Sequence, residues 1–108
     1  MSVQVYSPEG ECRRYEKLSS ITASIGFTSA KIEYKGRIAQ AALITVETAA
    51  IRFTMDGTTP VVTGGSVAGH KMDAGQSFVV RGTESIRNFR CINESASNGA
   101  VVFCSYYF

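Results

Sequence analysis

The sequence predicts an all-β protein: a single-domain antiparallel β-sandwich or barrel with an irregular N-terminal arm. Apolar and polar residues alternate with a period of two from residue 31 onward, which is typical of half-buried strands. Asp-Gly and Asn-Gly pairs interrupt this alternation where tight turns are needed. The 108 residues suffice for one hydrophobic core, so residues 1–108 are expected to form one domain.

Residues 1–30 differ from the rest because they are richer in Ser, Thr and charge and contain Pro8 and Gly10. Two short stretches there have strand character, VQVYS at 3–7 and CRRYEKL at 12–18. We expect this region to form an arm or an edge hairpin that packs less tightly than the rest.

Two strands are expected next. In KIEYK (31–35), charged residues alternate with Ile32 and Tyr34, and a turn follows at Gly36. QAALITVET (40–48) predicts a longer, well-covered strand. The residues that share one of its faces are Ala42, Ile44 and Val46.

The stretch IRFTMDGTTP (51–60) predicts a strand with one core face and one solvent face. The residues on its core face are Ile51, Phe53 and Met55. Asp56 and Gly57 tolerate positive φ, as a tight hairpin turn requires, and Pro60 directs the following chain to an edge or a loop. The glycine-rich segment 61–76 is expected to cross between sheets.

Further elements are expected in the last third of the chain. Residues 77–82 predict a short strand, 83–88 one helical turn that is too short for a stable helix, and 89–94 another strand. The Asn-Gly pair in SNGA (97–100) predicts a hairpin that leads into VVFCSYYF (101–108). The inward residues of the first strand are expected to be Phe78 and Val80.

The final run VVFCSYYF is apolar or aromatic on both faces. One face carries Val101, Phe103 and Tyr107, and the other carries Val102, Cys104, Tyr106 and Phe108. Such a strand is expected to be covered on both sides, either within a sandwich or by a neighbouring subunit.

The three cysteines, Cys12, Cys91 and Cys104, lack the paired short spacings of a zinc site. If residues 94–100 close a hairpin, Cys91 and Cys104 lie on the same face of it, opposite or diagonal. Two buried free thiols are the expected state, and a disulfide formed after release from a reducing cell is the alternative.

The charge distribution does not indicate a nucleic-acid partner. The 11 Lys and Arg residues are scattered among 9 acidic residues, and the net charge is +2. Two basic patches are expected to be solvated or to form interface ion pairs: Arg13-Arg14, and the trio Arg81, Arg87 and Arg90. No apolar run approaches the roughly 20 residues that span a bilayer, and no secretory signal is recognisable. We expect synthesis in the cytosol and no membrane anchor.

Catalytic chemistry is not expected. His70 would need a Cys or Ser and an orienting acid beside it, and Asp56 and Asp73 both lie within two residues of a glycine in turns. The cluster GGSVAG (64–69) lacks the spacing of a dinucleotide loop, and DGTTP holds one carboxylate, too few for calcium. We therefore predict a non-enzyme without catalytic, cofactor-binding or metal-binding residues.

Several stretches carry family resemblances. IRFTMDGTTP resembles a turn motif in the C-terminal β modules of chitobiase-like glycan-degrading enzymes. A wider set follows in order between residues 20 and 108: GFTSAKI, AALITVETAAIRFTMDGTTP, GHKMDAGQSFVV, IRNFRCINE and AVVFCSYYF. In this order they resemble a group of small virion structural proteins of tailed bacteriophages.

The wider resemblance implies a β-sandwich or barrel in the virion, made in the host cytoplasm, without catalytic residues. The expected role is capsid decoration, in which a homo-oligomer (trimer or dimer) binds and stabilises the lattice of the major capsid protein. A neck or tail adaptor or fibre-anchoring subunit is one alternative. A carbohydrate-binding module is another, although the chain has no Trp, the side chain that sugar platforms favour most.

Overall fold

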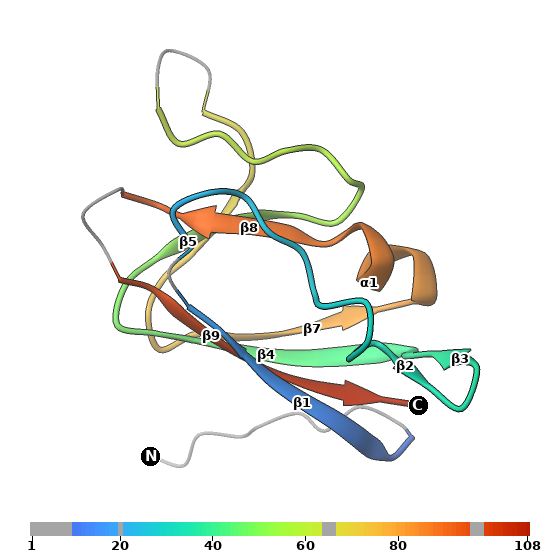
Figure 1. The fold of residues 1–108 in the computed structure, drawn as a ribbon. Helices are drawn as coiled ribbons and strands as arrows, with labels where there is room; N and C mark the ends of the chain where they lie inside the picture. The colour runs from blue at the N-terminus through green and yellow to red at the C-terminus, as the bar shows by residue number, and fades with distance from the viewer. Residues whose placement is uncertain (1–9, 20, 64–66, 96–98) are drawn as a thin grey trace.

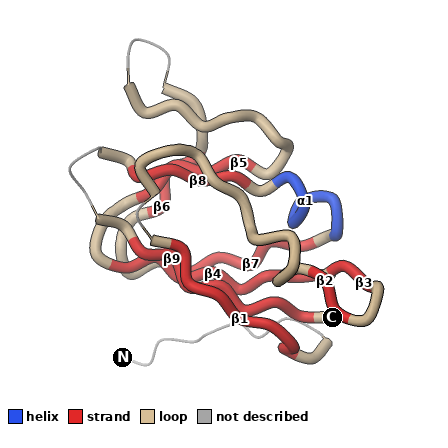
Figure 2. Tube along the Cα trace, in the orientation of Figure 1, coloured by secondary structure: helices blue, strands red, loops and turns tan. Residues whose placement is uncertain are grey.

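Strands dominate the structure, a computed structural model that describes residues 10–19, 21–63, 67–95 and 99–108 (Figures 1 and 2). In chain order the elements are β1 (Cys12–Leu18), β2 (Glu33–Tyr34), β3 (Arg37–Ile38), β4 (Ala41–Glu47), β5 (Ile51–Thr54), β6 (His70–Met72), β7 (Ser77–Arg81), α1 (Thr83–Asn88), β8 (Arg90–Asn93) and β9 (Val101–Tyr107). The predicted all-β class is confirmed.

Two antiparallel sheets pack as a sandwich. Within the described residues, the larger sheet has the order β1-β9-β4-β7, the smaller has β6-β5-β8, and β2 pairs with β3 as a separate hairpin. Figure 1 shows the two sheets as a lower and an upper layer, with the segment between β1 and β2 running up to the upper layer and back. The C-terminal strand β9 is an inner strand, paired with β1 on one side and β4 on the other.

The facing sides of the two sheets form the hydrophobic core. On β4, the predicted face of Ala42, Ile44 and Val46 is completely buried. The register sets Ile44 opposite Cys104 on β9 and opposite Phe78 on β7, so alternate residues of all three strands point inward. The period-two alternation therefore marked the correct inward face.

The segment between β1 and β2 packs more tightly than we expected. Ile21 is fully buried and Phe27 nearly so, because both belong to the core cluster between the sheets. A β-bridge from Ile25 ties the segment to β8. The strand expected at 12–18 is confirmed as β1, an edge of the larger sheet, whereas the one expected at 3–7 lies outside the described residues.

The strand expected at 31–35 is shorter than predicted. Its central residues form β2, which pairs with β3 in a hairpin whose loop has two residues. Lys35 and Gly36 form that turn with φ values of 50° and 77°, the pair of positive angles that a type I′ turn needs. The turn predicted at Gly36 is therefore confirmed.

Asp56-Gly57 forms a turn, but the tight hairpin predicted there is wrong. The partner of β5 is β6, which begins only at His70, so a long connection separates the two strands. The turn closes on itself instead: the Asp56 carboxylate accepts the N–H of Thr58, and the Thr54 hydroxyl donates to the Thr58 carbonyl. The predicted crossing between sheets within 61–76 is confirmed, although β6 forms inside that segment before the chain crosses to β7.

The helical turn expected at 83–88 is present as α1, although no side-chain hydrogen bond caps its N-terminus. Ile86 is completely buried, so packing rather than capping holds this short helix. The strand expected after it is confirmed as β8.

The hairpin predicted between the last two strands is wrong. β8 pairs with β5 and β9 pairs with β1 and β4, so the two strands belong to different sheets. The connection between them crosses the sandwich, and residues 96–98 within it lie outside the described part of the chain.

Candidate functional site

The candidate catalytic residues do not meet. His70 on β6 and Cys91 on β8 both face Phe53 of the strand between them, β5, so two strand spacings of about 10 Å in total separate their backbones. His70 is exposed whereas Cys91 is completely buried. This geometry provides no thiol–imidazole pair.

The acidic candidates each have a local partner. Asp73 pairs with Lys71 at 3.6 Å, and Asp56 accepts the Thr58 N–H at 3.0 Å. Within the residues that the structure describes, no group of three or more His, Cys, Asp or Glu is placed to hold a metal ion.

The Asp56 turn makes a testable contribution to stability. The hydrogen bond from the Thr58 backbone, followed by that from the Thr58 side chain, lowers the pKa of Asp56 below its ordinary value of 3.8. Because the folded-state pKa is lowered, the stabilisation is present above the ordinary pKa and is lost as the pH falls through the folded value.

We therefore expect Asp56→Ala to lower the melting temperature near pH 7 and to have a smaller effect at a pH below the folded-state pKa of Asp56. Asp56→Asn is the matched control, because its amide oxygen still accepts the Thr58 N–H. Thermal denaturation at the two pH values measures the difference. An Asp56→Ala variant with unchanged stability and lost partner binding would instead identify the turn as a contact.

The two core cysteines are inert rather than reactive. Cys91 and Cys104 are free and completely buried on different sheets, so the hairpin geometry considered for a disulfide does not exist. Burial raises the pKa of the Cys91 thiol to about 12, and it raises that of Cys104 as well. Since the thiolate is the nucleophilic form, neither side chain suits catalysis.

The outer face of the larger sheet carries partly exposed apolar and aromatic side chains, with the polar residues Lys17, Thr45 and Ser105 between them, and we call it the aromatic face. Cross-strand register places its members on the side opposite the core: Tyr15, Leu43, Val79, Phe103 and Tyr107. Tyr15 is 54% exposed and stacks on Phe103 with ring centroids 6.5 Å apart. Tyr15 is therefore accessible to a partner, while its neighbours on this face are only partly exposed.

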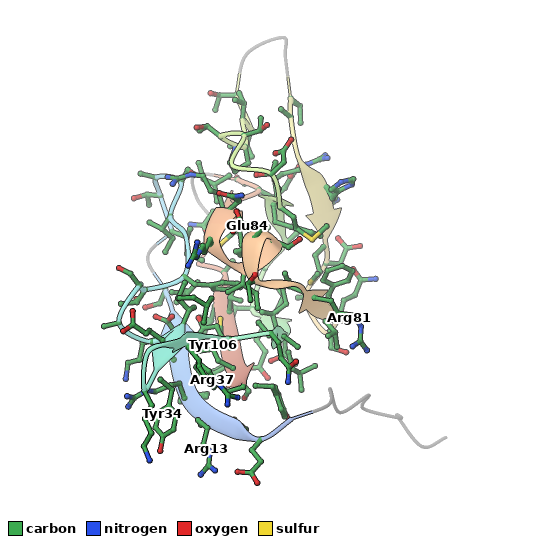
Figure 3. The ribbon with its side chains drawn as sticks, turned by 90° about the vertical axis from the view of Figure 1, so that its right-hand side faces the viewer. Arg13, Tyr34, Arg37, Arg81, Glu84 and Tyr106 are labelled. Atoms are coloured by element: carbon green, nitrogen blue, oxygen red, sulfur yellow. The ribbon has the colours of Figure 1, made fainter. Side chains whose placement is uncertain are left out.

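A second feature is a cluster of positive charge around the Tyr34 ring, which we call the basic cluster. Its cations come from β1 and from the β2–β3 hairpin: Arg13, Arg14, Lys35 and Arg37. The first three lie 5.6, 5.1 and 5.5 Å from the ring centroid, within cation–π range. Figure 3 shows Arg13, Tyr34 and Arg37 near one another at the lower end of the molecule.

Backbone features build this cluster. A bulge in β1 between Cys12 and Arg14 inserts Arg13 as an extra residue. The type I′ turn brings Lys35 beside the same ring. A depression of about 460 Å³ lies here, with Arg13, Tyr34, Lys35 and Arg37 among its lining residues.

The acids near this cluster do not cancel its charge. Glu11 forms an ion pair with Arg13, and Arg14 donates to the Glu33 backbone carbonyl at 3.4 Å. Among the described residues, no ion pair involves Lys35 or Arg37. The cluster therefore suits an anionic group on a ligand or partner.

The other basic patch predicted from the sequence is not such a site. Arg90 donates to the Ser24 hydroxyl and carbonyl, both at 2.8 Å, and so holds the segment between β1 and β2 against β8. Arg87 pairs with Glu84 within α1 at 3.4 Å. Arg87 and Arg90, which lie close together in the sequence, therefore each hold a contact within the chain.

Comparisons with family models, with curated proteins and with solved structures found no match for this chain. Within the described residues, no helix combines the length and apolar character that crossing a membrane requires.

Proposed function

We propose that the protein is a structural component of a tailed-bacteriophage virion that decorates the capsid by binding the lattice of the major capsid protein. The observation that carries the proposal is the aromatic face: a sheet surface on which exposed Tyr15 stacks on partly exposed Phe103, beside further partly exposed apolar side chains. The succession of motifs that resembles virion structural proteins supports the same role.

The physical basis is burial of apolar area against a repeated partner. Covering aromatic and aliphatic surface stabilises a contact by about 25 cal/mol per Å². Repetition over a symmetric lattice makes modest affinity per copy sufficient for full occupancy. Oligomers of the decoration protein would strengthen attachment in the same way.

The basic cluster requires that this partner present negative charge. Because Lys35 and Arg37 form no ion pair among the described residues, an acidic patch on the capsid is the complementary surface. Such charge complementarity mainly accelerates association and weakens as salt rises.

Binding to capsids that lack decoration tests the proposal. Purified protein should occupy lattice-symmetric positions in electron micrographs and should raise the thermal stability of the shell. Arg13→Glu with Arg37→Glu should weaken binding by about tenfold or more at low salt. Arg87→Glu combined with Lys71→Glu is the charge-matched control, because neither residue belongs to the basic cluster, and it should bind nearly as wild type. Absence of binding by the wild-type protein would contradict the proposal.

Attachment at the neck or tail is the second candidate function for a virion structural protein. It uses the same surfaces and differs in stoichiometry, since neck and tail rings hold few copies. A sugar-binding module is the candidate function outside virion structural proteins, and exposed Tyr15 would be its sugar platform. We expect no hits on a glycan array, and a reproducible hit lost in Tyr15→Ala would favour the module instead.

A further inference from the structure

The two edges of the larger sheet are unlike each other. At the β1 edge, a bulge and the charged side chains of Arg13 and Lys17 interrupt the flat strand, as is usual where edge pairing must be prevented. At the other edge, β7 keeps unbroken register with β4 from Ser77 to Arg81, and residues 77–80 carry no charge. The β7 edge is short and ends in Arg81, but it has neither a bulge nor a charged side chain among residues 77–80.

Hydrogen bonds at both ends of β7 fix which backbone groups point outward. The Gly82 N–H donates to the Gln40 carbonyl at 2.9 Å, and the Val46 N–H donates to the Gln76 carbonyl at 3.0 Å. Even-numbered residues of β7 therefore bond to β4. By the alternation of antiparallel ladders, Ser77 and Val79 direct their N–H and C=O groups away from it. No described strand pairs with that side of β7.

An apolar groove lies beside this edge. It has a volume of about 320 Å³ and runs between β6 and β7. Its apolar lining residues are Phe53, Met55, Met72 and Phe78, and His70, Lys71, Gln76 and Ser77 form its polar part. A strand added to β7 would place alternate side chains over this groove, so backbone pairing and apolar burial would occur together.

We propose that β7 pairs antiparallel with β7 of a second copy of this chain, about a two-fold axis at Val79. The two four-stranded sheets would then continue as one across the dimer. This inference does not rest on the proposed virion role.

Charge and shape favour a second copy as the occupant. With Val79 opposite itself, Ser77 faces Arg81 and Phe78 faces Val80, so no like charges are opposed. The same pairing sets the two apolar grooves next to each other, which suits an isologous contact.

Sedimentation of the full chain tests the pairing. At concentrations on the order of 100 μM we expect twice the 11.6 kDa monomer mass. Val79→Pro removes an N–H that β4 does not use, so it should weaken dimerisation at least about tenfold while the fold is kept. Val79→Thr keeps that N–H and the β-branched shape, and it should remain dimeric.

A charge variant keeps the test decisive if proline disturbs the fold. Val79→Lys places two like charges at the two-fold axis and should yield monomers with native circular dichroism. Thr45→Lys adds the same charge to the same sheet face but away from the edge, and it should stay dimeric. A monomeric or trimeric wild type, or a dimer unaffected by Val79→Lys, would overturn the inference.

Discussion

Replacing Phe89 with alanine is expected to lower the free energy of unfolding by about 3 to 5 kcal/mol. Phe89 is completely buried between the two halves of the core. Its ring stacks on Phe27 at 4.3 Å and on Phe53 at 5.8 Å, so it joins the segment between β1 and β2 to the smaller sheet. For a domain of about 100 residues, the melting temperature should fall by more than about 12 °C.

Tyr15→Ala is the control for this loss, since it removes an aromatic ring from an exposed position on the opposite face of the larger sheet. Its stability should stay within about 1 kcal/mol of wild type. Comparable losses in the two variants, measured by urea denaturation, would show that Phe89 does not organise the core as described.

Glu16→Ala is expected to cost about 2 to 4 kcal/mol, because one carboxylate serves three donors. Glu16 accepts the Thr28 N–H at 3.0 Å and the Thr28 hydroxyl at 2.6 Å, and it also accepts the hydroxyl of buried Tyr106. Removing it leaves the Tyr106 hydroxyl in the core without this acceptor. Burial and the Glu16 contact both raise the pKa of Tyr106, so its hydroxyl remains a donor.

Conservative variants separate this network from simple packing. Glu16→Gln keeps one acceptor oxygen and should lose less stability than Glu16→Ala. Tyr106→Phe removes the buried donor, so the double variant with Glu16→Ala should be more stable than the sum of the single losses predicts. Strict additivity in that cycle would contradict the coupling between Glu16 and Tyr106.

Strand positions and inward faces were largely predictable, because they follow from local alternation. The buried face of β4 is an example, and the type I′ turn at Gly36 is another. Sheet partners were not predictable in this way. Asp56-Gly57 indicated a tight hairpin, but its flanking strands β5 and β6 pair only across a long connection. The Asn-Gly pair near residue 98 indicated a hairpin between β8 and β9, but these strands belong to different sheets. A turn signal fixes where the chain bends, and long-range packing decides which strands become neighbours.

The two candidate surfaces also could not be predicted from local sequence. Arg13-Arg14 was visible in the sequence, but the fold adds Lys35 and Arg37 from a hairpin that is distant along the chain. The stack of Tyr15 on Phe103 likewise depends on pairing between the first described strand and the last. Such clusters carry no signal at short sequence spacing.

Copy number in purified phage particles tests the central claim most directly. Quantitative mass spectrometry against the major capsid protein should find on the order of hundreds of copies, in a fixed ratio set by the lattice. About six or twelve copies would place the protein at the neck or tail instead. Its absence from the particles would contradict the virion assignment altogether.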